Sequence, residues 1–179
     1  MIISFKRLVL LSALTVLLGV SLVYAVSYAF KPKNSAQTLP TAGGVNGQFG
    51  LKLTMTLEKT EYSLGEPINI TLTITNIGNQ TVNFSLAPSN WDFLVYNNTN
   101  DTVFEWLKSG RAFPMWVENV PLDPGMSLAE IFTWPQTFWI WNTTGVSGGM
   151  VSPGTYYIVG QYSAYSLQTT PIQVTIVKP

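Results

Sequence analysis

The stretch Ile68-Asn-Ile-Thr-Leu-Thr-Ile-Thr75 has an aliphatic side chain at every second position and a polar side chain between them. Side chains of a β-strand point alternately to its two faces, so this stretch predicts a strand with one buried and one exposed face. The same two-residue period occurs in residues 51–58 and 81–86. Further strands are expected at residues 91–97, 102–107, 127–134, 155–162 and 171–177.

Turn-forming residues separate these predicted strands. Examples are Asn76-Ile-Gly-Asn79, Asp123-Pro-Gly125 and Ser152-Pro-Gly154. Proline followed by glycine suits the two central positions of a type II turn, because the second position needs a positive φ. About eight short strands joined by such turns predict an all-β domain, an antiparallel β-sandwich of immunoglobulin-like architecture, over residues 50–179. The Cys…Trp…Cys pattern of antibody domains is absent.

The composition excludes several kinds of site. The 179 residues include no histidine and no cysteine, which removes Ser-His-Asp and Cys-His catalysis, Cys/His zinc sites and disulfides. From Gly50 onward, five basic residues face nine acidic ones, a net charge of −4. An acidic domain is a poor partner for nucleic acid or anionic lipid. We therefore expect no enzyme activity, no cofactor, no metal and no nucleic-acid partner.

The N-terminal segment has the pattern of an export signal. Lys6 and Arg7 precede 23 uncharged residues, 8–30. As a helix this run would be about 35 Å long, enough to cross a hydrocarbon core of about 30 Å. It predicts a transmembrane or signal helix over residues 1–30, either retained as a single-pass membrane anchor or cleaved near Ala25 or Ala29. In both cases the β-domain lies outside the cytoplasm.

Residues 31–49 are small and polar, with two prolines and three glycines. This composition predicts a flexible linker between the N-terminal helix and the β-domain.

Several motifs of the predicted β-domain occur in a definite order along the chain. The first is Glu61-Tyr-Ser-Leu-Gly-Glu-Pro-Ile68, followed by a strand that ends in Thr75-Asn-Ile-Gly78. The later motifs are Asp92–Val95, Val103–Trp106, Phe113, Leu122–Gly125, Phe132–Trp134, Pro153–Tyr156 and Gly160. In kind and order this set resembles the BsuPI domain, the intracellular proteinase inhibitor family. The resemblance implies an immunoglobulin-like sandwich and a protein-binding or inhibitory role, here in a membrane-anchored or exported version.

A cluster of large apolar residues, Phe138, Trp139, Ile140 and Trp141, is followed by the glycine-rich residues 142–149. One interpretation is an exposed interaction patch, or a membrane-contacting tip, beside a glycine-rich loop. The alternative is a short strand on which one alternating pair of these side chains faces the core.

Six Asn-x-Ser/Thr sequons are candidate N-glycosylation sites. Two fall on polar positions of predicted strands and four in predicted turns, so all six are expected to be exposed. They are Asn69, Asn79, Asn83, Asn97, Asn100 and Asn142.

A glycosidase pair or a hard-cation site needs two or more carboxylates close together. The candidates in this sequence are Asp92, Asp101, Glu105, Asp123 and Glu130. They have no recognisable ligand spacing, so we interpret them as solvated turn residues. We interpret Lys108-Ser-Gly-Arg111 as a solvated basic turn.

These observations favour a non-catalytic, extracytoplasmic protein-binding module tethered to the membrane through residues 8–30, with a proteinase as one candidate partner. The alternative is a structural subunit of a cell-surface assembly, in which Leu51–Leu57 acts as an edge strand and completes a neighbouring sandwich by strand addition. A hydrolase that uses carboxylates alone is a third hypothesis, disfavoured by their spacing.

Overall fold

The computed structural model describes residues 38–46, 49–110, 112, 114, 116–142 and 145–179. The predicted N-terminal helix, residues 1–30, and the first part of the predicted linker lie outside these residues. Within the described part of the chain, no helix is long and apolar enough to cross a membrane. Residues Leu39–Pro179 form one compact unit.

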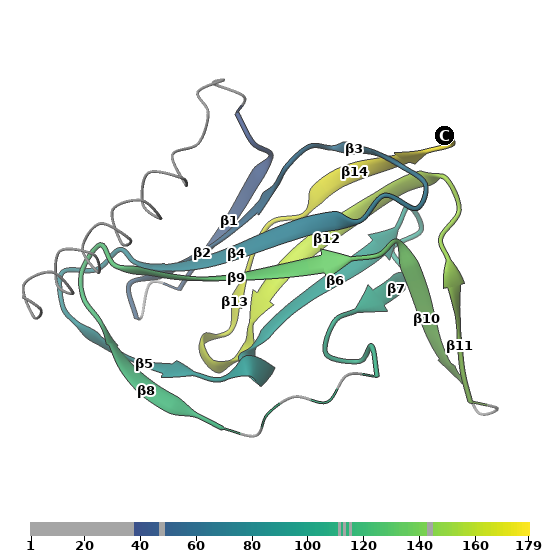
Figure 1. Cartoon of the computed structure of the whole chain (residues 1–179). Coiled ribbons are helices and arrows are strands. Elements are labelled where there is room, and N and C mark those ends of the chain that lie inside the picture. The colour runs from purple at the N-terminus through teal and green to yellow at the C-terminus, as the bar shows by residue number, and fades with distance from the viewer. Residues whose placement is uncertain (1–37, 47–48, 111, 113, 115, 143–144) are drawn as a thin grey trace, which may run out of the picture. The chain divides into compact units, whose positions relative to one another are not determined.

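Two sheets make up most of this unit (Figure 1). The first has four antiparallel strands in the order β1 (Thr41–Asn46), β2 (Leu51–Leu57), β4 (Ile68–Asn76) and β9 (Ser127–Trp134). The second has the order β3 (Glu61–Ser63), β14 (Ile172–Val177), β12 (Gly154–Tyr162), β6 (Trp91–Asn97) and β7 (Thr102–Glu105), with β13 (Leu167–Gln168) paired to the end of β12. Its ladders are antiparallel except for β3 with β14.

A two-stranded sheet, a hairpin and two short 3₁₀ turns complete the described elements. The two-stranded sheet pairs β5 (Val82–Leu86) antiparallel with β8 (Glu118–Leu122), and the hairpin is β10 (Thr137–Asn142) with β11 (Gly145–Met150). The 3₁₀ turns are η1 (Pro88–Asn90) and η2 (Ser163–Tyr165).

The all-β prediction is confirmed, and the described residues form mainly antiparallel sheets packed as a β-sandwich. Strands β6 and β9 have the predicted bounds, and β12 and β14 differ from the prediction by one residue. Sequence reasoning missed β3 and β13, which are too short to show a period, and β8, whose residues are mostly exposed.

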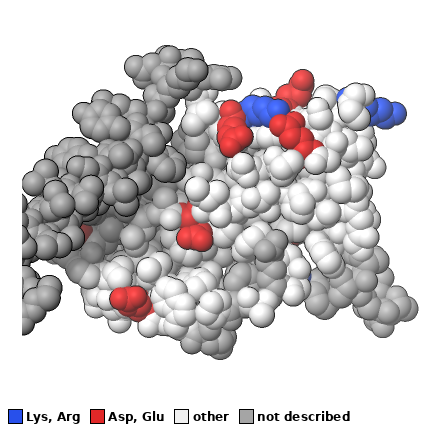
Figure 2. Space-filling view, viewed as in Figure 1, with Lys and Arg blue, Asp and Glu red and all other residues white. Residues whose placement is uncertain are grey.

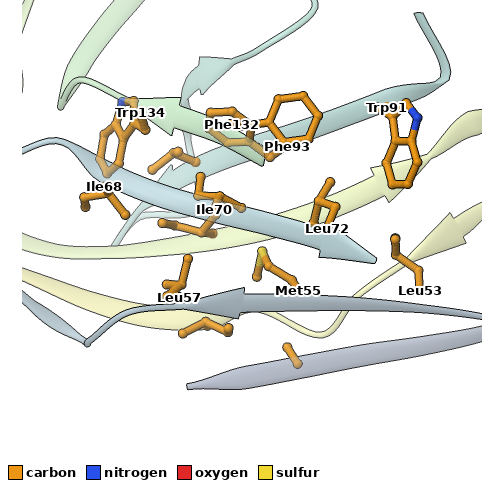
Figure 3. Packing of buried hydrophobic residues seen from close by; sticks show 14 of the residues in the cluster. Leu53, Met55, Leu57, Ile68, Ile70, Leu72, Trp91, Phe93, Phe132 and Trp134 are labelled. Carbon is orange, nitrogen blue, oxygen red and sulfur yellow. The ribbon is translucent and has the colours of Figure 1, made fainter. Parts of the chain in front are cut away.

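The core forms where the inward residues of the two sheets meet (Figure 3). In β2 and β4 the predicted alternation holds without exception, since every second residue is buried. Across the core, Gly160 of β12 lies so close to Leu72 of β4 that a Cβ at this position would overlap the leucine side chain. Aromatic rings from β6, β7 and β9 fill the remaining space of the core. The rings of Phe93 and Phe104 are stacked, with 5.4 Å between their centroids.

The predicted linker, residues 31–49, is wrong for residues 41–46, because these form β1 and pair with residues 51–56 of β2. Ala42 is buried, and Leu57 donates its backbone N–H to Pro40 O at 3.0 Å. Gly44 passes so close to the backbone carbonyl of Gln168 in β13 that no side chain would fit there. The small residues that suggested a linker therefore allow close packing, and the folded unit begins at Leu39 rather than Gly50.

The hypothesis that Leu51–Leu57 is an edge strand is also wrong. Strand β2 lies between β1 and β4, so its backbone groups are paired on both sides. The edges of this sheet are β1 and β9.

A buried asparagine joins the C-terminal end of β4 to two neighbouring turns. The Asn76 side chain is fully buried, and its amide donates to Gln80 O at 2.8 Å and Leu122 O at 2.7 Å. Its Oδ1 accepts the Gly78 N–H at 2.9 Å. The backbone of Asn76 adds bonds to Gly125 and Met126, so one residue fixes the turns at both 77–81 and 123–126.

We predict that Asn76→Ala lowers the free energy of unfolding by about 2–4 kcal/mol, because it leaves the buried Leu122 carbonyl and two partly buried groups, Gln80 O and the Gly78 N–H, without their partner. Asn79→Ala is the matched control, since Asn79 is exposed in the same turn and its replacement should cost within about 0.5 kcal/mol. Urea unfolding of both full-length variants measures the difference. Equal stabilities would contradict the assigned role of Asn76.

Candidate functional site

The β10–β11 hairpin contains the apolar cluster that sequence analysis singled out. The ladder pairs Phe138 with Gly149 and Trp139 with Gly148, so residues 145–150 are a strand and not the predicted glycine-rich loop. The glycines have a packing role: a Cβ at Gly148 would lie 2.8 Å from Phe138 O, and one at Gly149 would lie 3.2 Å from the Phe138 ring. Aromatic residues on one strand thus lie against glycines on the other.

The two described aromatic side chains of the hairpin have different environments. Phe138 is partly buried and packs against the hydrophobic core. Trp139 is 38% exposed and lines a shallow pocket of about 160 Å³ with Thr102 and Phe104 of β7, Glu105 and Lys108. Lys108 Nζ lies 2.9 Å from the Glu105 carboxylate, so the indole lies beside an ion pair. The strand interpretation is correct for Phe138, and Trp139 is available to a partner.

The side chains of Ile140, Trp141 and Asn142 lie outside the described part of the structure. The interaction patch over residues 138–141 therefore remains a prediction for these positions. The same holds for the membrane-contacting alternative.

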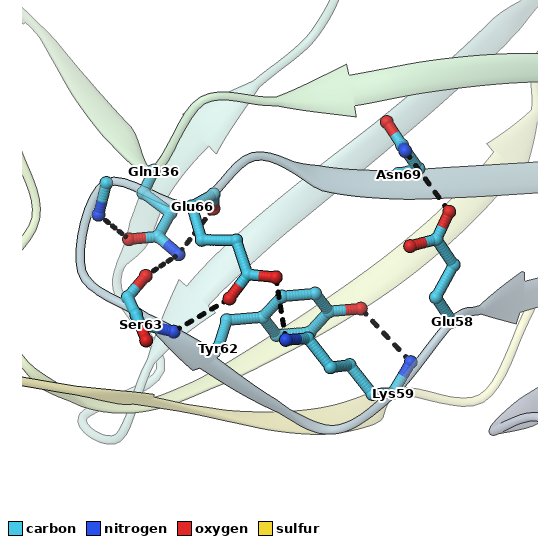
Figure 4. Close-up of polar contacts among 8 residues, drawn as sticks. Glu58, Lys59, Tyr62, Ser63, Glu66, Asn69 and Gln136 are labelled. Carbon is cyan, nitrogen blue, oxygen red and sulfur yellow. Dashed lines mark hydrogen bonds and ion pairs between the residues drawn. The ribbon is translucent and has the colours of Figure 1, made fainter. Parts of the chain in front are cut away.

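A buried glutamine fixes the base of the hairpin (Figure 4). Gln136 lies between β9 and β10 with a positive φ of 56° and a fully buried side chain. Its amide donates to Ser63 O at 3.0 Å and Glu66 O at 2.7 Å, and its Oε1 accepts the Gly65 N–H at 2.8 Å. Sequence analysis missed Gln136 because its partners lie about seventy residues earlier in the chain.

Two further bonds stiffen the same base. The Trp134 indole N–H donates to Thr137 O at 2.8 Å, and the Val151 N–H donates to Gln136 O at 2.8 Å. On the other side of Gln136, Glu66 forms an ion pair with Lys59 at 2.6 Å and accepts the Ser63 N–H at 3.0 Å. The hairpin is thus attached to the sandwich through a fully hydrogen-bonded joint.

The sequons differ in accessibility. Asn79, Asn83 and Asn100 are exposed, as predicted. Asn69 and Asn97 are only partly exposed, and their amides donate to Glu58 at 3.2 Å and to Asp101 at 3.0 Å. The prediction that all six are exposed is therefore wrong for these two, whose side chains form hydrogen bonds on the strand face or within the turn.

The carboxylates do not form a shared site. Asp101 accepts hydrogen bonds within its own turn, Glu105 pairs with Lys108, and Asp123 accepts the Thr81 hydroxyl at 2.6 Å. Within the described residues, no three acidic side chains are close enough to hold a metal ion. Arg111 of the predicted basic turn lies outside the described residues.

Asp92 contradicts the prediction of a solvated turn residue, because it lies in β6 and is only 6% exposed. Its Oδ1 accepts the Leu107 N–H at 3.2 Å and holds the turn that follows β7. Burial disfavours the charged carboxylate and raises the pKa of Asp92 to about 6, against the smaller opposing effect of its backbone hydrogen bonds.

Comparison with models of protein families shows which family the domain belongs to. The model of the BsuPI family, described as intracellular proteinase inhibitor, matches residues 55–166. This chain belongs to the BsuPI family. The match confirms the resemblance drawn from the ordered motifs, and it places the hairpin and the β9 strand inside the BsuPI domain. Among curated protein sequences, no significant match is found.

Solved structures show only distant similarity to this BsuPI domain. The C-terminal domain of wzt has 10% identity and a TM-score of 0.45, with 79% of this chain and 80% of that chain covered. A CARDB domain from Pyrococcus furiosus has 13% identity and a TM-score of 0.39, with 73% and 96% covered. A β-glucosidase from Listeria innocua has 16% identity and a TM-score of 0.40, with 70% of this chain but only 16% of the β-glucosidase covered.

We predict that Asp92 makes the BsuPI domain less stable as the pH rises. An unfolded aspartate has a pKa of about 3.9, below the folded value of about 6, so the native state binds more protons between these values. The free energy of unfolding should fall by about 2 kcal/mol from pH 4 to pH 7, since an unfolded aspartate is already about half ionised at pH 4. Asp92→Asn, which is neutral throughout, should remove this fall in denaturant titrations at both pH values.

The effect of Asp92 is the difference in the pH dependence of the free energy of unfolding between parent and variant. The other titratable groups contribute equally to both proteins, so their effects cancel. A parent and a variant with the same pH dependence would contradict the assignment.

Proposed function

We propose that this chain is a non-catalytic, proteinase-inhibitor-like binding module that contacts its partner through the β10–β11 hairpin. The observation that carries the proposal is the exposed Trp139, presented on a hairpin whose base is fixed by Gln136. Membership of a family described by inhibition rather than catalysis supports this reading.

A preformed contact element binds at a lower entropic cost than a flexible one. A loop that must be ordered on binding loses affinity for each side chain that it immobilises. Here the hydrogen bonds of Gln136 and the ladder between β10 and β11 order the element beforehand. Tryptophan is also among the residues that most often dominate binding energy at interfaces.

We further propose that the module is held outside the cytoplasm by residues 8–30. The support is the uncharged run of 23 residues after Lys6 and Arg7. With a tether of this kind the partner is a protein that reaches the outer face of the membrane. The exposed sequons Asn79, Asn83 and Asn100 would then be available for modification in a host that glycosylates exported proteins.

We predict that Trp139→Ala weakens inhibition of the target proteinase by about thirtyfold or more, as expected for an interfacial tryptophan that carries about 2 kcal/mol. Its effect on stability should be small, because the side chain is 38% exposed. Inhibition constants against a panel of serine, cysteine, aspartic and metalloproteinases, together with thermal melts, measure both effects.

Phe138→Ala is the matched control on the same strand. Because Phe138 packs against the core, its truncation should cost up to about 3 kcal/mol of stability. If no proteinase in the panel is inhibited by the parent chain, the inhibitor-like function is wrong. If inhibition is found but Trp139→Ala leaves it unchanged, the hairpin is not the contact element.

We predict that the full-length chain stays in the membrane pellet after alkaline carbonate extraction of host membranes. The reason is that residues 8–30 present no charge to the hydrocarbon core. Immunoblotting of the soluble and pellet fractions, with mass determination of the N-terminus, measures this. Recovery in the soluble fraction of a chain that begins after Ala25 or Ala29 would contradict the retained anchor.

A further inference from the structure

Strand β9 is an open edge of the first sheet. It pairs with β4 along residues 127–134, and no other strand of the described residues pairs with its far side. In an antiparallel ladder every second residue directs its N–H and C=O away from the partner strand. Among the described residues, no backbone group of β9 forms a hydrogen bond outside the ladder with β4. Such an edge is a template for one more strand.

The sandwich is also open along part of β9. Trp134 and Phe132 are inward residues of this strand and are buried, as the alternation requires. Glu130 follows in the same phase but is exposed, because the facing sheet does not cover it. Its outward neighbour Ile131 is 69% exposed.

A groove of about 300 Å³ occupies this opening. Most of its lining is aromatic or aliphatic, and among the described residues that line it Glu130 is the one with a charge. The lining includes Trp91, Trp106, Trp116, Glu130, Ile131 and Phe132. A groove of this composition fits a large apolar side chain.

The walls of the groove are held by the core, so the groove is formed before anything binds. The rings of Trp106 and Phe132 meet edge to face at 5.2 Å between centroids, and Trp91 meets Tyr162 in the same way at 4.8 Å. Figure 3 shows Phe132 beside Phe93 at the top of the core. Trp116 is different, since it is 44% exposed and can contact a ligand directly.

The negative charge of Glu130 favours an occupant with a positively charged side chain. Glu130 forms no ion pair or hydrogen bond with the described residues. The domain carries nine acidic against five basic residues. Figure 2 shows mostly uncharged surface with scattered acidic side chains over much of this face. A cationic side chain on the occupant would therefore be attracted to Glu130.

We propose that β9 and this groove bind an extended segment of a partner protein that carries a basic residue and a large apolar residue two positions apart. A strand added to β9 has its own alternation, so its residues opposite Glu130 and Phe132 share the face that points into the groove. The basic residue pairs with Glu130, and the apolar residue enters between Trp116 and Phe132. This surface contains no residue of the β10–β11 hairpin.

The probe is a labelled threonine-rich peptide as long as β9, eight residues, with lysine and phenylalanine two positions apart. A second peptide has glutamate in place of the lysine. Fluorescence anisotropy with the full-length chain in mild detergent should show up to about fivefold tighter binding of the lysine peptide, the size of an exposed ion pair.

Glu130→Lys should reverse this preference, so that the glutamate peptide binds more tightly. Glu118→Lys is the matched control, because it makes the same charge change on the exposed β8 outside the groove, and it should leave the preference for lysine in place. Trp116→Ala should weaken both peptides by about thirtyfold, as for an aromatic anchor. Trp139→Ala should leave peptide binding unchanged, which separates this site from the hairpin.

The proposal is overturned if Glu130→Lys and Glu118→Lys shift the preference equally, or if Trp116→Ala leaves the affinities unchanged. Sedimentation provides a further test. If the chain is a dimer that Ile131→Lys dissociates, and neither peptide binds, a second copy occupies the edge and the proposal is wrong.

Discussion

Buried amide side chains hold both ends of β4, the strand on which the other strands of the first sheet depend. At its C-terminal end Asn76 binds the turns before β5 and after β8. Before its N-terminal end, Gln136 binds the turn at residues 63–66. Buried backbone groups must be hydrogen-bonded, and this chain has no disulfide or histidine-metal link that could join these turns instead. The two amides therefore stabilise the places where the chain leaves the sheet.

This arrangement separates the rigid and the accessible parts of the domain. Between the two amides, the inward residues of β2 and β4 form a core without a charged group. The β10–β11 hairpin extends from the joint at Gln136, and the groove beside β9 opens where the second sheet ends. The hairpin is held by the hydrogen bonds of Gln136 and the groove by packed aromatic rings, so at both surfaces a partner meets a preformed shape, which lowers the cost of binding.

Local pattern predicted the strands well and the sites only in part. The alternation of residues 68–75 predicted their inward face correctly, whereas the aromatic run at residues 138–141 left open whether its side chains face the core or the solvent. The pattern did not reveal that Asp92 is buried, because a single aspartate in a strand reads as an exposed position. It also did not reveal the groove, since Trp91, Trp116 and Glu130 come from three separate segments.

The sequence by itself determined the β-sandwich through the two-residue period and the family through the order of its motifs. It also excluded disulfides and every site that needs cysteine or histidine, because the chain contains neither residue. Only the tertiary structure decided that residues 41–46 are a strand, that β2 is interior and that β9 is an open edge. Strand order depends on pairing between distant segments, and the period of a strand does not encode its neighbour. The same reason explains why Gln136, whose partners lie about seventy residues away, was visible only in the folded chain.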